Sequence, residues 1–576
     1  MDERTDGRIN AKYLIGFIIL WVAQMATAFY FCTQKQGFHE DEFYTYYSTA
    51  RTNGFYVENG KWMDRETYRN EFVVLPGERF QYGLVRQVQS WDVHPPMYYW
   101  VFHTVASFFP GVFSKWIGLS VNLFFHGINL LLLARLTYLV SKKDGKMVLL
   151  VNLVYGFCPA AMSGVVFIRM YEMLTTFVLL CAVLHVRVVL GDRDGGGRTV
   201  QSRAKFDGSE RAADRLPTAT LFAMAAVTYL GFLTQYYYFI FLFFLAGAFC
   251  LWLLWRERRI GNCLRYALMQ GLAFCLAYLT YPAFPGQMFR GQRGAQATRS
   301  FFDLSNTFER IGFFLDLING YVFGYLFFVI PLAVVTLAVR VYRRRGKQNV
   351  EQDRRSEEVR FGAAFWILLF TAAGYFLAVS KTALLLGNTS NRYQLPIYAV
   401  IVLLALYSCK TLWRQAVSAS GSRRTVAEAA ALAFCLAMVV SGYVCTDVVF
   451  LYPEAGEAVA LAREQAAVKI PVVYVYQPGE EWCIWAVADE LMEYERVYFV
   501  SAENTEPLKE PAVMDADAVV IYLPCSDDGK EEAAQGMWLL SGNAKLSEGR
   551  LQYRHKYCSK WYYCGDETAA DSGENP

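Results

Sequence analysis

The sequence predicts an all-α polytopic membrane bundle of about 11 to 13 helices, followed by a small α/β domain on the external side of the membrane. Three observations support this fold class. The chain has 576 residues, of which 55% are hydrophobic and 16% aromatic, which is too apolar for an ordinary soluble protein. Apolar runs long enough to cross a bilayer recur through residues 1–450. Residues 451–576 instead alternate short strand-like and helix-like stretches.

The predicted helices follow from these apolar runs. The first, from about Tyr13 to Phe31, is followed by no small-residue cleavage site, so we expect it to be retained as a helix. Each further span needs about 20 apolar residues. Such stretches lie near 95–110, 116–140, 147–167, 170–190, 218–234, 236–255, 266–285, 311–339, 361–380, 394–412 and 427–450.

The charge of the connecting segments predicts the orientation, because Lys and Arg accumulate on the cytoplasmic side. The basic segments are 141–146, 187–216, 256–265, 340–360 and 410–424. If these are cytoplasmic, the external segments are 32–94, 287–310, 381–393 and the tail after 450. Two apolar stretches, however, separate the external His94 from the basic 141–146. Either one stretch is re-entrant or this short loop breaks the charge rule.

The tail has the pattern of a small α/β domain. Strand-like runs at 471–476, 496–500 and 518–523 are interleaved with helix-like stretches at 457–468 and 488–495. This alternation predicts a short parallel sheet, and we expect a disordered C-terminal end. No glycine-rich phosphate loop follows any of these strands, so nucleotide binding is not supported. We interpret the domain as structural or as recognising an acceptor.

Charge and cysteine usage narrow the function classes further. The formal net charge is only +3, which gives no large field to gather nucleic acid. Of thirteen cysteines, several lie in apolar runs, where cysteine behaves as a small hydrophobe. A Cys558–Cys564 disulfide is one possibility in the polar tail, if the compartment is oxidising and the geometry allows it.

The long loop 32–94 carries the first candidate chemistry. Glu40, Asp41 and Glu42 come only a few residues after the first helix. Adjacent carboxylates repel one another, which can raise one pKa and provide a proton acceptor. The alternative is that they are simply the hydrated start of a loop.

The same loop ends in Asp92 and His94, followed by Pro95 and Pro96. Proline is favoured at the first position of a helix, so this pair is expected to open the next helix and to place Asp92 and His94 at the external membrane surface. A histidine in such a position is more often structural than catalytic. The same holds for His103 and His126.

Two arginines stand beside long apolar runs. A cation at membrane depth is expensive and usually faces a cavity or an anionic partner, which makes Arg169 and Arg392 candidates for binding an anion. Alternatively, Arg169 forms an intrahelical pair with Glu172, and Arg392 extends to the membrane surface. The weaker candidates are Gln235, Lys381, and the loop residues Arg290, Arg293 and Arg299, which we expect to be solvated.

Four motifs stand in order along the chain. They are Asp41-Glu42, Asp92-x-His94-Pro95-Pro96-x-Tyr98-Tyr99, Arg169-x-Tyr171, and Arg392-Tyr393 followed by Pro396. Together they resemble the motifs of the polytopic GT-C glycosyltransferases, the family of protein O-mannosyltransferases, the lipid A aminoarabinose transferase and bacterial lipopolysaccharide core transferases. The resemblance covers about residues 10–450. Two departures are Gln235, where relatives often carry histidine, and Lys115, where arginine is usual.

The resemblance implies a membrane hexosyl- or pentosyltransferase that moves a sugar from a polyprenyl-phosphate carrier to a hydroxyl of a glycan, lipid or protein acceptor, with inversion. It implies that Asp41 is the general base, with Glu42 beside it, and that Arg169 and Arg392 hold the carrier phosphate. Further substrate-binding residues would be Asp92, His94, Tyr98, Tyr171 and Tyr393.

The resemblance implies no required cofactor. A divalent metal near Asp41, Asp92 and His94 stays open because carboxylates and imidazole are common ligands. The tail lacks the sugar-binding repeat domain that many eukaryotic protein mannosyltransferases insert, which together with the loop charge favours a bacterial plasma membrane.

Two other functions compete with this interpretation. A transporter or flippase of a lipid-linked or anionic solute could use Arg169 and Arg392 along a path through the bundle. Such proteins typically show inverted repeats or broken helices in matching halves, and neither is evident in the sequence. A catalytically inactive scaffold whose tail binds a partner is the third possibility.

Overall fold

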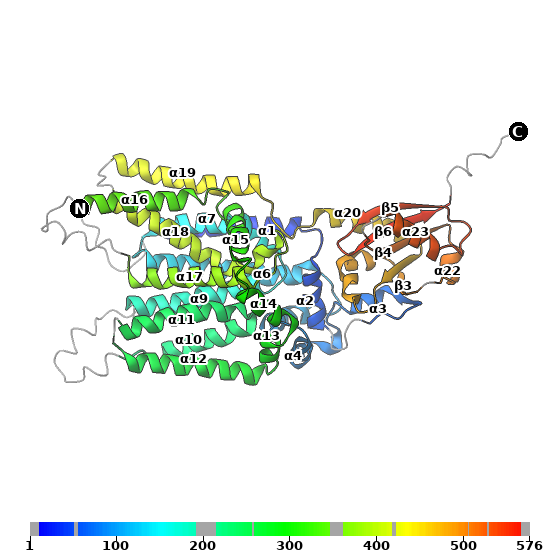
Figure 1. Ribbon diagram of the computed structural model, residues 1–576, viewed down its shortest axis with the longest axis horizontal. Helices are drawn as coiled ribbons and strands as arrows, with labels where there is room; N and C mark the ends of the chain where they lie inside the picture. The colour runs from blue at the N-terminus through cyan, green and yellow to red at the C-terminus, as the bar shows by residue number, and fades with distance from the viewer. Residues whose placement is uncertain are drawn as a thin grey trace. The chain divides into compact units, whose positions relative to one another are not determined.

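The computed structural model describes residues 11–50, 56–191, 215–255, 258–345, 361–416, 422–504, 506–526 and 529–565. The chain divides into two compact units. The helical unit comprises Met1–Thr33, Gln89–Tyr98 and Gly118–Val449. The sheet unit comprises Gln34–Val88, Tyr99–Ile117 and Phe450–Pro576. Figure 1 shows the helices of the first and the strands of the second.

The helical unit confirms the predicted polytopic bundle. Among the described residues, 8 helices are long and apolar enough to cross a membrane, or up to 9 if the bent pair α7–α8 is one span. The chain is therefore a multi-pass membrane protein. Its helices are α1 (Ala11–Gln34), α6 (Lys115–Val140), α7 (Gly145–Phe157), α8 (Pro159–Val166), α9 (Tyr171–Leu190), α10 (Thr218–Thr234), α11 (Tyr237–Trp255), α12 (Ile260–Thr280), α13 (Phe284–Phe289), α14 (Gln292–Phe302), α15 (Thr307–Tyr321), α16 (Val329–Arg345), α17 (Ala363–Thr382), α18 (Leu395–Ala416) and α19 (Ser422–Cys445).

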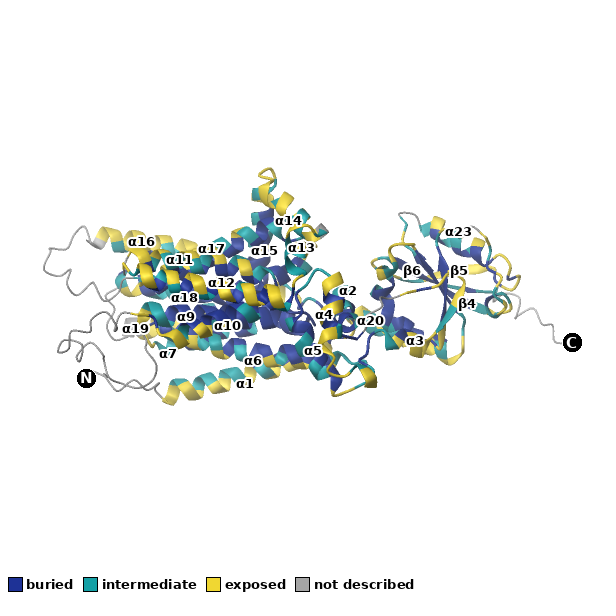
Figure 2. Cartoon of the chain, turned by 90° about the horizontal axis from the view of Figure 1, so that it is seen from below, coloured by how far each residue is buried: buried dark blue, intermediate teal, exposed yellow. Residues whose placement is uncertain are grey.

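Burial orders these helices from the centre of the bundle to its periphery. About 67% of the apolar window of α9 and of α18 is buried, against 11% for α1 and 17% for α19. Figure 2 shows this as dark blue in α9 and as much yellow and teal along α1. A helix that is apolar all round but exposed in the protein presents its apolar surface to lipid.

Two predicted continuous stretches are broken. The stretch 147–167 divides into α7 and α8, which meet at a bend of 57° where Pro159 cannot continue the hydrogen-bond ladder. The stretch 311–339 divides into α15 and α16. There Gly324 has a positive φ of 56°, and a Cβ at this position would lie 2.3 Å from the Met438 carbonyl oxygen.

The stretch 95–110 forms a helix of only 11 residues, α5 (Met97–Ser107). At 1.5 Å per residue, it extends for about 16 Å, about half of a hydrocarbon core. This length favours the alternative in which 95–110 does not cross the membrane, which removes the conflict between external His94 and the basic 141–146.

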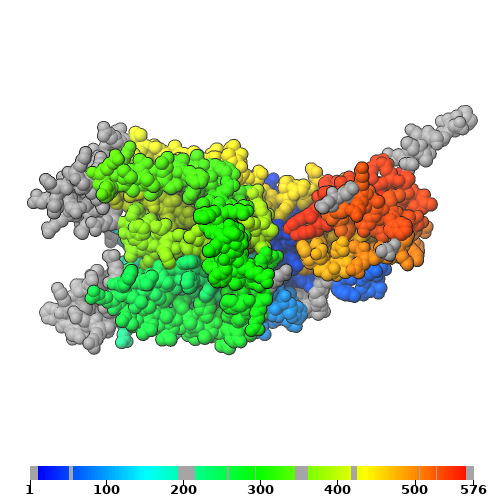
Figure 3. Space-filling model, viewed as in Figure 1, coloured from blue at the N-terminus to red at the C-terminus, as the bar shows by residue number. Residues whose placement is uncertain are grey.

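The segment α13–α15 lies across the long helices of the bundle, with α14 packed on α17, and Figure 3 shows it as a green ridge. It exposes several large apolar side chains. They are Phe289, Phe301, Phe302, Leu304 and Phe308.

The sheet unit contains a 6-stranded sheet of order β1-β3-β2-β4-β6-β5. The predicted parallel core is confirmed, because β2 pairs in parallel with both β3 and β4. Three antiparallel strands extend this core and were not predicted. The strands are β1 (Lys61–Asp64), β2 (Val472–Tyr476), β3 (Arg496–Ser501), β4 (Ala518–Pro524), β5 (Glu548–Arg554) and β6 (Cys558–Cys564).

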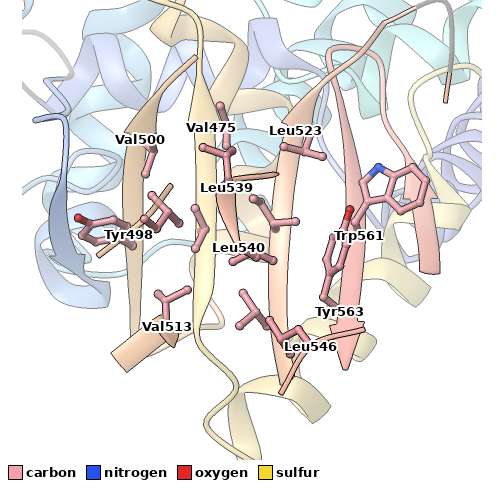
Figure 4. Packing of buried hydrophobic residues seen from close by; sticks show 14 residues of the cluster. Val475, Tyr498, Val500, Val513, Leu523, Leu539, Leu540, Leu546, Trp561 and Tyr563 are labelled. Atoms are coloured by element: carbon pink, nitrogen blue, oxygen red, sulfur yellow. The ribbon is translucent and has the colours of Figure 1, made fainter. Parts of the chain in front are cut away.

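One face of the sheet packs an apolar core. Figure 4 shows Val475, Val500 and Leu523 on this face, covered by Leu539 and Leu540. The remaining helices of the unit are short. They are α2 (Glu40–Ala50), α3 (Arg65–Asn70), α4 (Tyr82–Trp91), α20 (Pro453–Ala467), α21 (Ala488–Leu491), α22 (Pro511–Met514) and α23 (Gly529–Leu539), with the 3₁₀ turns η1 (Pro76–Glu78) and η5 (Glu481–Val487).

Three details differ from expectation or lie outside the described residues. The Cys558–Cys564 disulfide is wrong: the two thiols are free and stand at opposite ends of β6, about 20 Å apart at 3.3 Å per residue. The helix expected at 488–495 ends at Leu491. Residues 192–214, 346–360 and 417–421 of the basic segments, and the C-terminal end beyond residue 565, lie outside the described residues.

Candidate functional site

In the helical unit, the structure brings together three of the predicted residues. The Asp92 Oδ2 atom lies 3.0 Å from His94 Nδ1, and the Arg169 Nη2 atom lies 3.2 Å from His94 Nε2. The same Nη2 atom lies 3.4 Å from His94 Nδ1. Because an ionised carboxylate can only accept, Nδ1 of His94 carries a proton and donates it to Asp92. The side chains of Asp92 and His94 are each about one fifth exposed, so solvent or a ligand reaches them.

The backbone of this loop is fixed by residues that sequence reasoning missed. Gln287 Nε2 donates to the backbone oxygens of Asp92 (2.5 Å) and Gln89 (2.9 Å). The Tyr281 hydroxyl also donates to the Gln89 oxygen, at 2.5 Å. Gln287 in turn accepts a hydrogen bond from the Tyr236 hydroxyl. Since these groups are far apart in sequence, no local pattern could have revealed them.

The charge on Asp92 is stabilised by its neighbours. Burial by itself raises the pKa of this carboxyl, but His94 and Arg169 outweigh burial, and the pKa lies below the usual 3.8. Asp92 is therefore ionised at neutral pH. An ionised Asp92 orients the imidazole of His94 and is not a proton donor.

Arg169 lies in the break between α8 and α9, not inside a helix, and it is only 3% exposed. Asn122 of α6 stabilises this break by donating to the carbonyl oxygens of Val165 (3.0 Å) and Phe167 (2.6 Å). The hydroxyl of Tyr98 donates to Asn122 Oδ1 at 3.3 Å. Tyr98 thus acts on the backbone beside Arg169.

The structure gives Glu172 partners other than the intrahelical pair considered from the sequence. Its Oε2 atom accepts from Asn129 Nδ2 at 2.7 Å and lies 3.4 Å from His126 Nδ1. Both partners belong to α6, and all three side chains are buried. The hydrogen bond from Asn129 to Glu172 therefore ties α9 to α6.

Arg392 lies in the 3₁₀ turn η4 (Thr389–Tyr393) and is 4% exposed. Its guanidinium stacks over the rings of Phe167 and Tyr393, at 5.4 and 5.1 Å from their centroids. The Tyr393 ring also meets Tyr171 and Tyr237 edge to face. An arginine held between aromatic faces keeps a fixed orientation. The Arg392 Nη2 atom also donates to the Tyr393 hydroxyl at 3.2 Å. Arg392 is buried and does not extend to the surface.

The weaker candidates from the sequence either make contacts within the fold or lie exposed. Lys381 donates to the Asp303 oxygen, Asn306 Oδ1 and Thr307 Oγ1, which fastens α17 to the segment before α15. Gln235 ends α10 and accepts from the backbone N–H of Tyr236. The three arginines of the α13–α14 segment, at 290, 293 and 299, are exposed, in agreement with the expected solvation.

In the sheet unit, the three adjacent carboxylates have different surroundings. Glu42 is fully buried and accepts from Lys35 Nζ at 2.9 Å and from the His39 backbone N–H at 2.6 Å. Glu40 is 15% exposed, whereas Asp41 is 30% exposed. Asp41 is thus the most accessible of the three, and its carboxylate lies 3.7 Å from His39 Nδ1.

The expectation that repulsion raises a pKa is not met at Glu40. Burial raises its pKa, but His39 and the donating Lys556 lower it further, so the net shift is downward. Glu40 Oε1 accepts from Lys556 Nζ and from the Tyr557 hydroxyl. Both donors follow β5, and they hold the start of α2.

Across the residues that the structure describes, no group of three or more His, Cys, Asp or Glu side chains is placed to hold a metal ion.

No protein-family model and no curated protein matches the chain. Among solved structures, the chain is similar to ArnT from Cupriavidus metallidurans bound to undecaprenyl phosphate, with a TM-score of 0.45, 11% identity, and coverage of 95% of this chain and 98% of that one. It is also similar to the oligosaccharyltransferase AglB from Archaeoglobus fulgidus in complex with an inhibitory peptide and a dolichol-phosphate, with a TM-score of 0.42, 13% identity, and coverage of 96% and 75%. Both are GT-C glycosyltransferases, the family that the sequence motifs resemble.

Proposed function

We propose that this protein transfers a sugar from a polyprenyl-phosphate carrier to an acceptor hydroxyl at the external membrane face, with inversion and with Asp41 as general base. The observation that carries the proposal is the placement of Arg169 and Arg392. Both are buried cations in short segments between long apolar helices. A lipid-linked phosphate is an anion attached to an apolar chain, so it suits binding by cations at such positions.

The charge pattern supports an external position for both arginines. We infer that α1, α6, the α7–α8 pair, α9 to α12 and α16 to α19 each cross the membrane. The basic segments then all fall on the cytoplasmic side, as the distribution of Lys and Arg requires. The breaks with Arg169 and Arg392, and the chain after residue 450, fall on the external side.

The reaction is a single displacement at the anomeric carbon. The acceptor oxygen forms a bond to this carbon, while the bond from the carbon to the phosphate oxygen breaks and its electron pair leaves with the phosphate. Asp41 takes the proton of the acceptor hydroxyl. Its higher exposure than that of Glu40 and Glu42 suits this role, because a base has to reach the substrate.

The leaving phosphate gains negative charge in the transition state. Fixed guanidinium groups aimed at that charge lower the barrier more than they stabilise the ground state. In this proposal Arg392, oriented by Phe167 and Tyr393, binds the phosphate directly. Arg169 shares the task, and Asp92 and His94 hold Arg169 in place.

The test is transfer of radiolabelled sugar from synthetic polyprenyl-phosphate hexoses and pentoses by the detergent-solubilised full chain, with and without chelator. We expect label to move to an acceptor, or slowly to water, with wild type and not with Asp41→Asn. No turnover of any donor by protein shown to be folded would overturn the proposal. Loss of turnover with chelator would assign a metal to the reaction.

A transporter or flippase remains the second candidate, and one observation favours it. The sequence showed no broken helix, but the structure has the 57° bend at α7–α8, and broken helices line substrate sites in many transporters. Uptake of a polyprenyl-phosphate sugar into proteoliposomes without chemical turnover would support this candidate.

A further inference from the structure

The sheet unit contains a cavity of about 290 Å³ that no step of the proposed reaction uses. It lies at the carboxyl ends of β2 and β4, under the turn between β5 and β6. Its lining residues are Tyr474, Val475, Tyr476, Gln477, Glu480, Cys483, Ile484, Pro524, Cys525, Lys556 and Tyr557.

The sheet topology explains why a cavity forms there. From β2 the chain continues to β3 on one side, and from β3 it returns across β2 to β4 on the other side. The connections that leave β2 and β4 therefore run in opposite directions and leave a space between them. In open α/β sheets, ligands bind at this position, outside the carboxyl ends of the strands where the strand order reverses.

The lining indicates the chemistry of the ligand. The turn after β2 carries Glu480 and Glu481 and is not rich in glycine, and acidic groups at such a turn repel phosphate. The tyrosines, Gln477, Glu480 and Lys556 instead offer donors and acceptors beside aromatic rings. A polyhydroxylated ring compound fits this combination, and the volume lies near the lower end of the range for small-molecule sites.

The cavity is connected to the helix of the proposed base. Lys556 and Tyr557 line the cavity, and both donate to Glu40 Oε1. Glu40 is the first residue of α2 and directly precedes Asp41. A ligand in the cavity thus contacts the same two side chains that hold the start of α2.

We propose that this cavity binds a saccharide unit of the acceptor, so that the acceptor is a glycan. This inference rests on the proposed function, because it names the acceptor class for the reaction at Asp41. Binding in the cavity anchors one sugar ring of the acceptor glycan, and another of its hydroxyls is the one that Asp41 deprotonates.

Calorimetric titration of the full chain with methyl hexosides and hexose disaccharides tests the binding, in a detergent without a sugar head group. Glu480→Gln removes a charged acceptor from the lining and is expected to weaken binding about tenfold or more. Cys525→Trp fills the cavity from an exposed position and is expected to abolish it. Glu481→Gln is the matched control, since it makes the same change one residue away from the lining and should bind as wild type.

The outcomes separate this inference from the proposed function. Donor hydrolysis to water needs no acceptor, so Glu480→Gln and Cys525→Trp should keep it while losing transfer to saccharides. If wild type turns over donor but no saccharide binds, or if a serine- or threonine-containing peptide binds in its place, the inference fails and the function stands. If saccharides bind in the cavity but no donor is turned over, the proposed function fails and the cavity is a saccharide site of another activity.

Discussion

Two ionic clusters, one in each unit, differ in how far their charged side chains are buried. In the sheet unit, Lys35 and Glu42 are both fully buried, and Lys35 also donates to the Phe450 oxygen at 2.7 Å. In the helical unit, Asp92 and His94 remain about one fifth exposed beside the buried Arg169. A fully buried ion pair stabilises the fold, because removing one charge leaves the other buried without a partner. An open cluster can still exchange a partner for a substrate.

The same contrast applies within the acidic triplet. Glu42 forms a buried ion pair with Lys35, and Glu40 accepts hydrogen bonds from Lys556 and Tyr557, while Asp41 is the most exposed of the three. We infer that Glu40 and Glu42 position α2 and that Asp41 carries the proton transfer. Sequence alone could not assign these roles, because the three residues are adjacent and chemically similar.

The largest expected effect is on turnover. Asp41→Asn should lower the rate of sugar transfer by a factor of about 10² to 10⁴, the usual contribution of a general base, without changing the thermal unfolding temperature. Radiolabel transfer at saturating donor measures the rate, and circular dichroism in detergent measures unfolding. Near-normal turnover of Asp41→Asn would assign the proton transfer to another group.

Breaking the buried Lys35–Glu42 ion pair should lower the stability of the fold. Lys35→Met leaves Glu42 buried without its cation, which should cost about 3–5 kcal/mol of folding free energy. The double variant Lys35→Met/Glu42→Gln removes both charges and should recover a large part of this loss. Denaturant unfolding of the full chain measures both. Equal stability of the single variant and wild type would show that the pair contributes nothing to the fold.

In the helical unit, the proposed phosphate contact of Arg392 predicts a smaller effect, on donor affinity. Arg392→Ala should weaken binding of the polyprenyl-phosphate donor about 10- to 150-fold, which corresponds to about 1.5–3 kcal/mol for hydrogen bonds to a charged group. Arg392→Lys keeps the charge but not the planar fork, so it should recover only part of the affinity. Donor titration measures this. Unchanged affinity with reduced stability would give Arg392 a structural role.

The fold was predictable wherever one local signal dominated. Long apolar runs fixed most of the helices, and the runs at 471–476, 496–500 and 518–523 form the parallel β2, β3 and β4 as expected. The missed strands carry weak signals. β1 has only four residues, and β5 is mostly polar and partly exposed, so that only pairing with a partner strand makes them part of the sheet.

The candidate site was predictable only in its charged residues. Buried charge is costly, so Arg169 and Arg392 stood out among apolar neighbours. Asn122 and Gln287 were missed because their role depends on backbone atoms about 43 and 195 residues away along the chain. A neutral amide gives no sign of such a partner in the sequence.

The smallest expected effect, counted per pH unit, concerns a third ionic cluster, which lies around Glu490 in the sheet unit. Glu490 accepts from Lys560 at 3.1 Å and from Tyr522 at 2.8 Å, and lies 3.0 Å from His555. The adjacent Asp489 is different. Burial and the charge of Glu490 raise the pKa of Asp489 to about 7, from its ordinary value of 3.8.

The sign of the pH dependence follows from this raised pKa. Between about pH 4 and pH 7 the folded chain keeps the Asp489 proton while the unfolded chain has lost it, so stability falls as pH rises, by at most about 1.4 kcal/mol per pH unit. Asp489→Asn cannot ionise, so it should be more stable than wild type at pH 8 and should lose this slope. Unfolding midpoints from pH 5 to pH 8 measure it, with Asp517→Asn, at an exposed position, as control. Parallel pH profiles for wild type and Asp489→Asn would show that Asp489 ionises normally, because burial then costs its charged form little.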